Sequence, residues 1–127
     1  MKKVTGIGGI FFKSKNPQEM KDWYGKHLGL NVTPYGVIFE TRKVDNPEEK
    51  SSTIWSPFKE DTNYFAPSPK EFMINYQVEN LEALLEALKA EGVEQVGEMQ
   101  VHEYGKFAHI MDPEGNKIEL WEPQPEA

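Results

Sequence analysis

The sequence predicts an α+β fold in which two βαβββ modules form one curved, cup-shaped mixed sheet, with the helices on its outer face. Three observations lead to this prediction. The same order of extended and helical patterns occurs twice, each helical pattern carries one apolar stripe, and the extended segments alternate with period two. We expect a single domain over residues 1–127, with the first module at about 1–60 and the second at about 70–123.

Each module opens with an extended segment that leads into a helix. These segments are Thr5–Lys13 in the first module and Glu71–Val78 in the second. An asparagine stands shortly after each one, at Asn16 and Asn80. Asparagine is a favoured N-cap, because its side chain accepts a hydrogen bond from a first-turn N–H. We therefore expect each helix to begin directly after its asparagine.

Both helices are predicted to pack one apolar stripe against the sheet. The stripe residues recur at i, i+3, i+4 and i+7. They are Met20, Trp23, Tyr24 and His27 in the first helix, and Leu81, Leu84, Leu85 and Leu88 in the second. Each pattern stops at a glycine, Gly29 or Gly92, which predicts a left-handed C-terminal cap.

The later strands of the two modules can be aligned with each other. The paired segments are Val37–Thr41 with Lys106–Ile110, and Thr53–Pro57 with Glu119–Pro123. On this alignment Glu40 corresponds to His109, and Thr53 corresponds to Glu119. The first module carries an extra segment, Arg42–Ser52, which we expect to form an exposed loop because it is rich in turn-forming residues.

The C-terminal hairpin is the most informative part of the chain. Its centre, Asp112–Asn116, reads DPEGN, a strong turn signal because proline presets one φ angle and glycine tolerates a positive one. Patterning then favours the register in which Met111 faces Lys117, since a one-residue slip would mix the polar and apolar faces. This register places His109 directly opposite Glu119.

Composition argues against several classes of function. The net charge of −7 and pI near 5.0 argue against nucleic-acid binding, which usually requires a basic surface. The absence of cysteine excludes thiol nucleophiles, thiolate metal sites and disulfides. It also fits a reducing compartment, so we expect a cytoplasmic protein. No segment has the length and hydropathy of a membrane span, so we expect no membrane partner.

The sheet face opposite the helices is expected to bind a small molecule. The side chains assigned to it are mostly aromatic with few polar groups, which is typical of ligand sites. The expected ligand-binding residues are Phe11, Glu40, Thr53, Trp55, Met73, Asn75, Gln77, Phe107 and Trp121. His109 and Glu119 are candidate catalytic residues on the same face, since an imidazole beside a carboxylate can move a proton. An ordinary surface ion pair is the simpler interpretation of these two.

The doubled module, the first helix NPQEMKDWYGKHLGL and the C-terminal DPEGNKIELWEP resemble the glyoxalase, bleomycin-resistance and extradiol-dioxygenase family, the vicinal oxygen chelate superfamily. This resemblance covers nearly the whole chain. It implies a homodimer, and one of several activities: isomerase, lyase, epimerase, ring-cleaving dioxygenase, or drug binding without catalysis. It also implies one divalent metal, held by side chains from the first and last strands of each module.

The resemblance carries over a single metal ligand, Glu119. The other three positions fall on Gly8 or Gly9, on Thr53 or Ser52, and near Met73. None of these residue types is a good ligand for a divalent cation, which prefers imidazole and carboxylate groups. We therefore expect the usual metal site to be absent, or relocated to His109 and Glu119 with Glu40 or water completing the shell.

Three functional hypotheses follow. The leading one is a protein that binds a small apolar or aromatic molecule in the cup, with the usual metal site largely lost. The alternative is an enzyme, a lyase or isomerase or a related activity, that uses His109 and Glu119 for acid–base chemistry or as ligands of a relocated metal. A protein-interaction module that pairs through the open sheet face is a further possibility.

Overall fold

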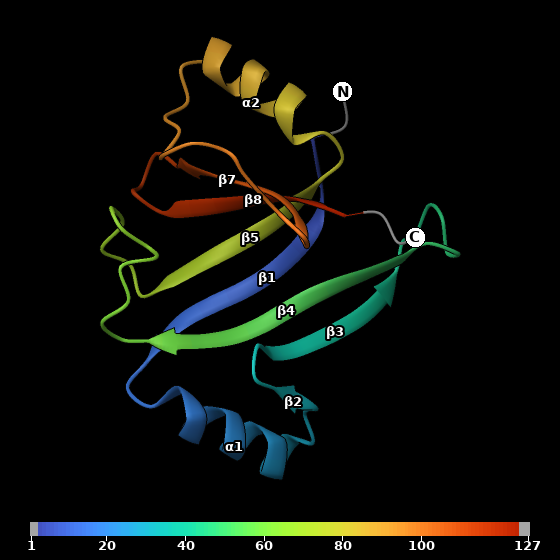
Figure 1. Cartoon of the computed structure of the whole chain (residues 1–127), viewed down its shortest axis with the longest axis vertical. Helices are drawn as coiled ribbons and strands as arrows, with labels where there is room; N and C mark the ends of the chain where they lie inside the picture. The colour runs from blue at the N-terminus through green and yellow to red at the C-terminus, as the bar shows by residue number, and fades with distance from the viewer. Residues whose placement is uncertain (1–2, 125–127) are drawn as a thin grey trace.

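Two βαβββ modules lie edge to edge in one eight-stranded mixed sheet with two helices, as the sequence predicts (Figure 1). This computed structural model describes residues 3–124. The first module contains β1 (Val4–Ser14), α1 (Pro17–Leu28), β2 (Val32–Thr33), β3 (Gly36–Arg42) and β4 (Lys50–Lys59). The second contains β5 (Phe72–Val78), α2 (Leu81–Ala90), β6 (Gln100–His102), β7 (Gly105–Met111) and β8 (Lys117–Pro123).

The first strands of the two modules join the halves of the sheet. The strand order is β2-β3-β4-β1-β5-β8-β7-β6, and β1 pairs antiparallel with β5 at its centre. Within each module the last strand pairs with the first in parallel: β4 with β1, and β8 with β5. The residues at the middle of β1, β5 and β8 therefore lie next to one another, although they are far apart in the sequence.

The predicted helix caps are present. The side chain of Asn16 accepts a hydrogen bond from the backbone N–H of Glu19 at 3.0 Å, and Asn80 accepts one from Ala83 at 3.1 Å. Gly29 caps α1 in the left-handed conformation, with φ of 69°. In α2 the cap is Glu91, and the left-handed glycine, Gly92, follows one residue later.

The β3–β4 hairpin is longer than the sequence indicates. The segment Arg42–Ser52 was expected to be a loop, but β3 continues to Arg42 and β4 begins at Lys50. The pairing also places Phe39, rather than Glu40, opposite Thr53. The alignment of Glu40 with His109 is therefore wrong by one residue, because the register of β3 against β4 differs by one residue from the register that the alignment implies.

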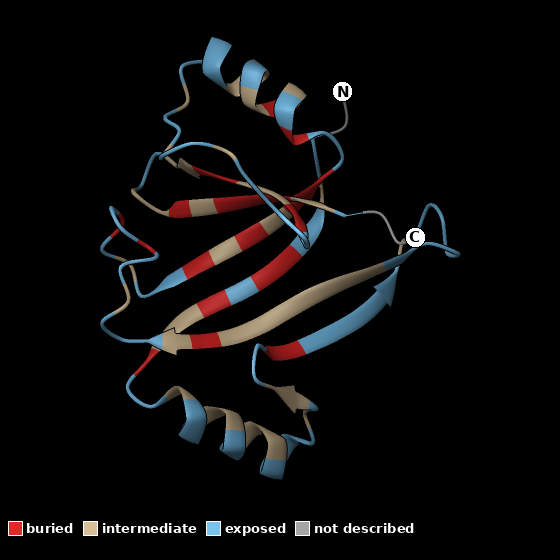
Figure 2. Cartoon of the chain, viewed as in Figure 1, coloured by how far each residue is buried: buried red, intermediate tan, exposed pale blue. Residues whose placement is uncertain are grey.

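The helices cover the two ends of one sheet face very differently (Figure 2). Under α2, the buried residues Val78, Leu84 and Leu120 form part of a tight apolar cluster. By contrast, α1 contains no buried residue. It rests on the sheet largely through aromatic contacts, including Tyr24 against Trp55 at 4.7 Å between ring centroids. We call the face that carries both helices the helix side, and the opposite face the open face.

The segment that links the modules, residues 60–71, folds over part of the open face. Phe65 from this segment is fully buried against Phe11 and Met73. Its ring also contacts Phe58 of β4, with 5.3 Å between centroids. This end of the open face is therefore filled by the chain itself.

Candidate functional site

The C-terminal hairpin adopts the predicted register. Met111 faces Lys117, and His109 faces Glu119. The two side chains meet directly, with 2.8 Å between His109 Nε2 and Glu119 Oε2. Because an ionised carboxylate can only accept hydrogen bonds, Nε2 carries the proton in this contact.

The Glu119 carboxylate receives hydrogen bonds from three side chains. His109 and the hydroxyl of Tyr64 both donate to Oε2, and the amide of Asn75 donates to Oε1 at 2.7 Å. Glu119 itself is almost entirely buried, with 3% exposure. A buried charge is strongly destabilising unless it is paired and hydrogen-bonded, so these three donors make the ionised form tolerable.

The cluster changes the ionisation of its members. Burial favours the neutral acid of Glu119, but the hydrogen bonds from His109, Tyr64 and Asn75 outweigh burial and hold its pKa below the ordinary value. Burial and the neighbouring Glu119 charge raise the pKa of Tyr64 well above its usual range. The carboxylate is therefore ionised and the phenol neutral over the whole physiological pH range.

Tyr64 was missed by the sequence analysis, because it belongs to the segment between the modules and has no periodic pattern around it. Lys117 helps to hold it in place. The Lys117 ammonium donates to the backbone carbonyl of Tyr64 at 2.7 Å and lies 5.3 Å from the centre of its ring. The one signal in the sequence is the adjacent pair of aromatic residues, Tyr64 and Phe65, inside a polar and proline-rich stretch.

Close packing around Gly8 fixes the position of Asn75. A Cβ atom at Gly8 would lie 2.3 Å from Asn75 Oδ1 and 2.8 Å from the Trp121 ring. The backbone of β1 can therefore approach these side chains only because residue 8 is glycine. Asn75 Oδ1 has no hydrogen-bond partner among the described residues, so the amide is oriented by its donation to Glu119.

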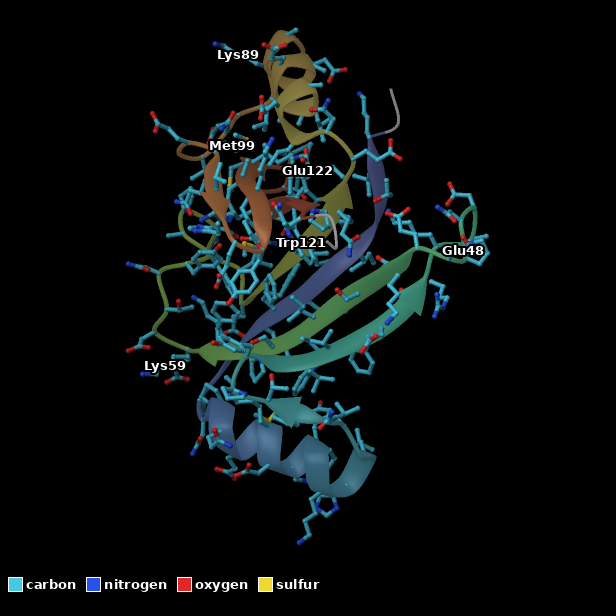
Figure 3. The ribbon with its side chains drawn as sticks, turned by 45° about the vertical axis from the view of Figure 1, so that its right-hand side comes forward. Glu48, Lys59, Lys89, Met99, Trp121 and Glu122 are labelled. Atoms are coloured by element: carbon cyan, nitrogen blue, oxygen red, sulfur yellow. The ribbon has the colours of Figure 1, made fainter. Side chains whose placement is uncertain are left out.

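A pocket of about 410 Å³ opens beside this cluster, near β6 and β7. Its lining consists of Tyr64, Gln100, His102, Glu103, Tyr104, Phe107 and Glu119. The Phe107 ring stacks on Trp121, with 5.9 Å between centroids and 5° between planes. Trp121, labelled in the middle of Figure 3, is 8% exposed and donates its indole N–H to the Tyr104 carbonyl at 2.9 Å. One wall of the pocket is therefore a rigid aromatic stack.

The sequence profile of the Glyoxalase/Bleomycin resistance protein/Dioxygenase superfamily matches residues 6–120. The chain belongs to this superfamily. The resemblance drawn from the doubled module and the C-terminal motif is thus confirmed. No functionally curated protein matches the sequence. None of the helices within residues 3–124 has the length and hydropathy to cross a membrane.

Several solved structures share the superfamily fold at low sequence identity. Methylmalonyl-CoA epimerase from Mycobacterium tuberculosis has a TM-score of 0.63 and 20% identity, covering 98% of this chain and 92% of that one. A variant of the Streptomyces coelicolor methylmalonyl-CoA epimerase, in complex with 2-nitronate-propionyl-CoA, has a TM-score of 0.71 and 14% identity, covering 96% and 99%. NAD-dependent benzaldehyde dehydrogenase from Legionella pneumophila has a TM-score of 0.59 and 11% identity, covering 91% and 98%. At these identities the similarity establishes the fold alone.

The residues around Glu119 do not fit the metal site of the superfamily. The three groups that contact the carboxylate present N–H or O–H donors to it, whereas a cation needs lone pairs. A side chain at Gly9 would also lie 2.6 Å from the Phe11 ring, so the first-strand ligand position is closed. Within residues 3–124, no three His, Cys, Asp or Glu residues are grouped for metal binding, so the expected relocated site with Glu40 does not assemble.

The structure separates the predicted ligand-binding residues into three groups. The first group lies at the pocket: Phe107 lines it, Trp121 stacks on Phe107, and Asn75 donates to Glu119. Phe11 and Met73 lie on the open face but are buried under Phe65. Gln77 is there too, but its amide already binds Ser52 and Ser51 of β4, at 2.6 and 3.1 Å.

Three other predicted residues lie outside the lining of the pocket. Trp55 is on the helix side, where it packs on Tyr24 of α1, and Thr53 shares that face because side chains alternate along a strand. Glu40 is on the open face, opposite Ser52, but it is exposed near the end of the β3–β4 hairpin and does not line the pocket. The expectation that Thr53 and Trp55 face the cup is therefore wrong. The cause is the same one-residue difference in the register of β3 against β4.

We expect Glu119→Gln to lower the free energy of unfolding by about 2–3 kcal/mol at pH 7, because an amide cannot accept three charge-assisted hydrogen bonds. The folded-state pKa of Glu119 is lowered, so its ionised form stabilises the fold above the pKa of the unfolded chain, and this contribution disappears as the pH falls through the folded-state pKa. Urea denaturation from pH 7 to pH 3 should show the two proteins converging on the acid side.

Glu86→Gln is the matched control for this substitution, since Glu86 is exposed on α2. It should differ from the wild type by less than about 0.5 kcal/mol. A Glu119→Gln protein as stable as the wild type at pH 7 would contradict the assignment of an ionised, triply bonded carboxylate.

Proposed function

We propose that this protein binds a small aromatic or apolar molecule in the pocket beside Phe107, without the metal site of its superfamily. The observation that carries this proposal is the pocket of about 410 Å³, which is large enough for a compact ligand. The stacked rings of Phe107 and Trp121 form a flat wall, against which a planar ligand can pack. Because the chain lacks cysteine, the reducing cytoplasm remains its expected compartment.

Binding is favoured over carboxylate catalysis by the state of Glu119. A general base works best when its pKa lies near the operating pH. Three hydrogen bonds and a lowered pKa make Glu119 a weak base, and its oxygen atoms are already engaged by Tyr64, His109 and Asn75. The cluster supports a role as a fixed polar wall that orients a ligand.

Acid–base catalysis is the second candidate, because His109 contacts Glu119 directly and Glu119 lines the pocket. In that role His109 would exchange a proton with a bound carbonyl or hydroxy compound while Glu119 orients the ring.

For a ligand found to be converted, we expect His109→Gln to lower kcat at least about 100-fold if His109 moves the proton. His27→Gln, a substitution in the stripe of α1, serves as the control and should leave kcat unchanged. Turnover that survives in His109→Gln would eliminate this candidate and leave binding as the function of the pocket.

Phe107→Ala tests the binding proposal. We expect it to weaken a ligand identified by isothermal titration against a panel of aromatic compounds by about 10-fold or more, because burying an aromatic side chain contributes about 1.5–3 kcal/mol. Phe39→Ala is the control, since Phe39 is comparably aromatic but lies on the helix side of β3. If no compound of a broad panel binds the wild type, the proposal is wrong.

We also propose a homodimer that forms through the helix side. Four apolar side chains of the central strands, between the two helices, are 42–49% exposed there: Val4, Ile7, Ile10 and Phe72. A row of half-exposed aliphatic and aromatic groups is typical of an interaction surface. A two-fold contact between two such rows would cover both at once.

We expect the wild type to elute as a dimer in size-exclusion chromatography with light scattering at micromolar concentration, and Ile7→Lys/Ile10→Lys to elute as a monomer. A lysine in the middle of an apolar contact would be desolvated without a partner. Val44→Lys, at a residue 98% exposed in the β3–β4 turn, should remain dimeric. A monomeric wild type would refute the proposed interface.

A further inference from the structure

The pocket beside Phe107 carries negative charge. Glu103 and Glu119 both line it, and its described lining contains no lysine or arginine. Two lysines of the neighbouring strands β7 and β8 already have partners. Lys117 donates to the Tyr64 carbonyl, and Lys106 pairs with Glu82 at 2.7 Å. The Lys117 ammonium already occupies the side of Tyr64, 5.3 Å from its ring centre, so a ligand meets the carboxylates from the side of Glu103 and Phe107.

Aromatic rings surround the same space. Tyr64, Tyr104 and Phe107 line the pocket, and the His102 ring lies 5.8 Å from that of Phe107. The pKa values of both tyrosines are raised, for Tyr64 mainly by burial and for Tyr104 mainly by Tyr35 and Glu103, so both phenols stay neutral. Neutral rings present electron-rich faces, which attract cations within about 6 Å of the ring centre.

The chain as a whole favours the same kind of ligand. Its net charge of −7 raises the local concentration of cations around the protein and lowers that of anions. An anionic ligand would have to approach an acidic protein and then enter a pocket lined by two carboxylates. A neutral ligand would gain the aromatic contacts but nothing from the charges.

We propose that the pocket selects an organic cation, a planar ring system bearing a quaternary or protonated nitrogen. The ring lies against the Phe107 face, and the charge lies between the aromatic rings and the carboxylates of Glu103 and Glu119. This inference rests on the proposed binding function and specifies its ligand class.

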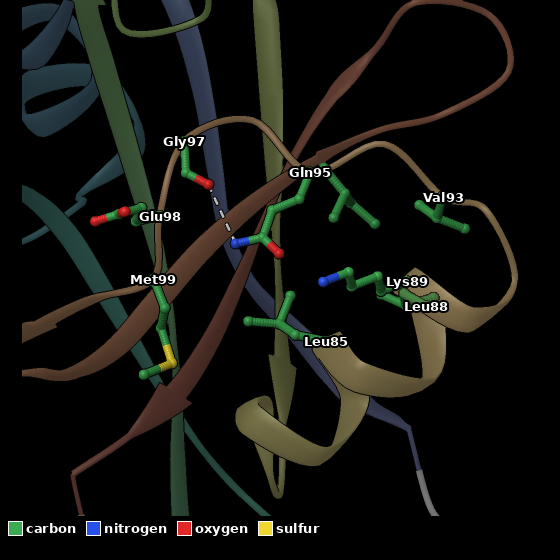
Figure 4. A pocket seen from close by; sticks show the side chains of 9 residues that line it. Leu85, Leu88, Lys89, Val93, Gln95, Gly97, Glu98 and Met99 are labelled. Atoms are coloured by element: carbon green, nitrogen blue, oxygen red, sulfur yellow. Dashed lines mark hydrogen bonds between the residues drawn. The ribbon is translucent and has the colours of Figure 1, made fainter.

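A second cavity, of about 500 Å³, provides a useful contrast (Figure 4). It lies on the helix side, between α2 and residues 93–99, with aliphatic walls that include Leu85 and Met99. Lys89 and Glu98 both line it, so its charges are balanced. Its lining, among the residues that the structure describes, contains no aromatic ring and selects no cation.

The test compares three probes of similar shape by isothermal titration calorimetry at pH 8: N-methylquinolinium, neutral quinoline and 1-naphthoate. We expect N-methylquinolinium to bind at least about 10-fold more tightly than quinoline, and 1-naphthoate to bind more weakly than both. Raising sodium chloride from 50 to 300 mM should weaken the cation by about two- to fivefold and leave quinoline unchanged, because salt screens exposed charges.

Glu103→Gln removes one carboxylate at an exposed position outside the Glu119 cluster, so the fold should be unaffected. We expect it to weaken N-methylquinolinium by about three- to tenfold and to leave quinoline unchanged. Glu98→Gln is the matched control, because this carboxylate lines the second cavity instead. It should alter neither affinity, and a loss of cation binding in Glu98→Gln would overturn the assignment to the Phe107 pocket.

The outcomes separate the two levels of the proposal. Equal or tighter binding of quinoline would overturn the cation inference while supporting an aromatic binding site. Binding of 1-naphthoate more tightly than N-methylquinolinium would also overturn the cation inference and support an aromatic binding site. Failure of all three probes, together with a silent aromatic panel, would overturn the inference and the binding function alike.

Discussion

The structure of the site depends on one constraint, which is that the buried charge of Glu119 must be compensated. The three donors come from different parts of the chain: His109 from β7, Asn75 from β5, and Tyr64 from the segment between the modules. Satisfying this carboxylate therefore ties β5, β7 and β8 of the second module to the path of the linking segment. Losing any one donor would leave part of a buried charge unpaired, which is costly in a low-dielectric interior.

The fold was predictable because its signals are local. Asparagine caps, apolar stripes and the DPEGN turn each act within a few residues, and the turn determines which residues face one another in the last hairpin. The same reasoning failed for the β3–β4 hairpin, which has no comparable two-sided pattern around its turn. There the strands extend to Arg42 and Lys50, and period two converts a one-residue error into the wrong face for Thr53 and Trp55.

The candidate site was predictable only in its two local members, His109 and Glu119. Tyr64 reaches Glu119 across 55 residues of sequence, and no periodicity reports where a connecting segment will fold. The sequence also does not predict the role of Gly8, because this role depends on how closely β1 approaches Asn75 and Trp121. Long-range contacts of this kind arise from packing three strands and a loop together, and a single sequence carries no direct record of them.

The open face shows how donors of the chain itself can compensate a buried carboxylate. In a metal site, the cation compensates a buried carboxylate and holds it in place. Here three N–H and O–H groups supply that compensation, so the carboxylate is already stable without an ion. Phe65 fills the end of the cup near Phe11, and the remaining volume lies toward Phe107. A ligand is thereby directed to the aromatic end, where it meets the outer edge of the same polar cluster.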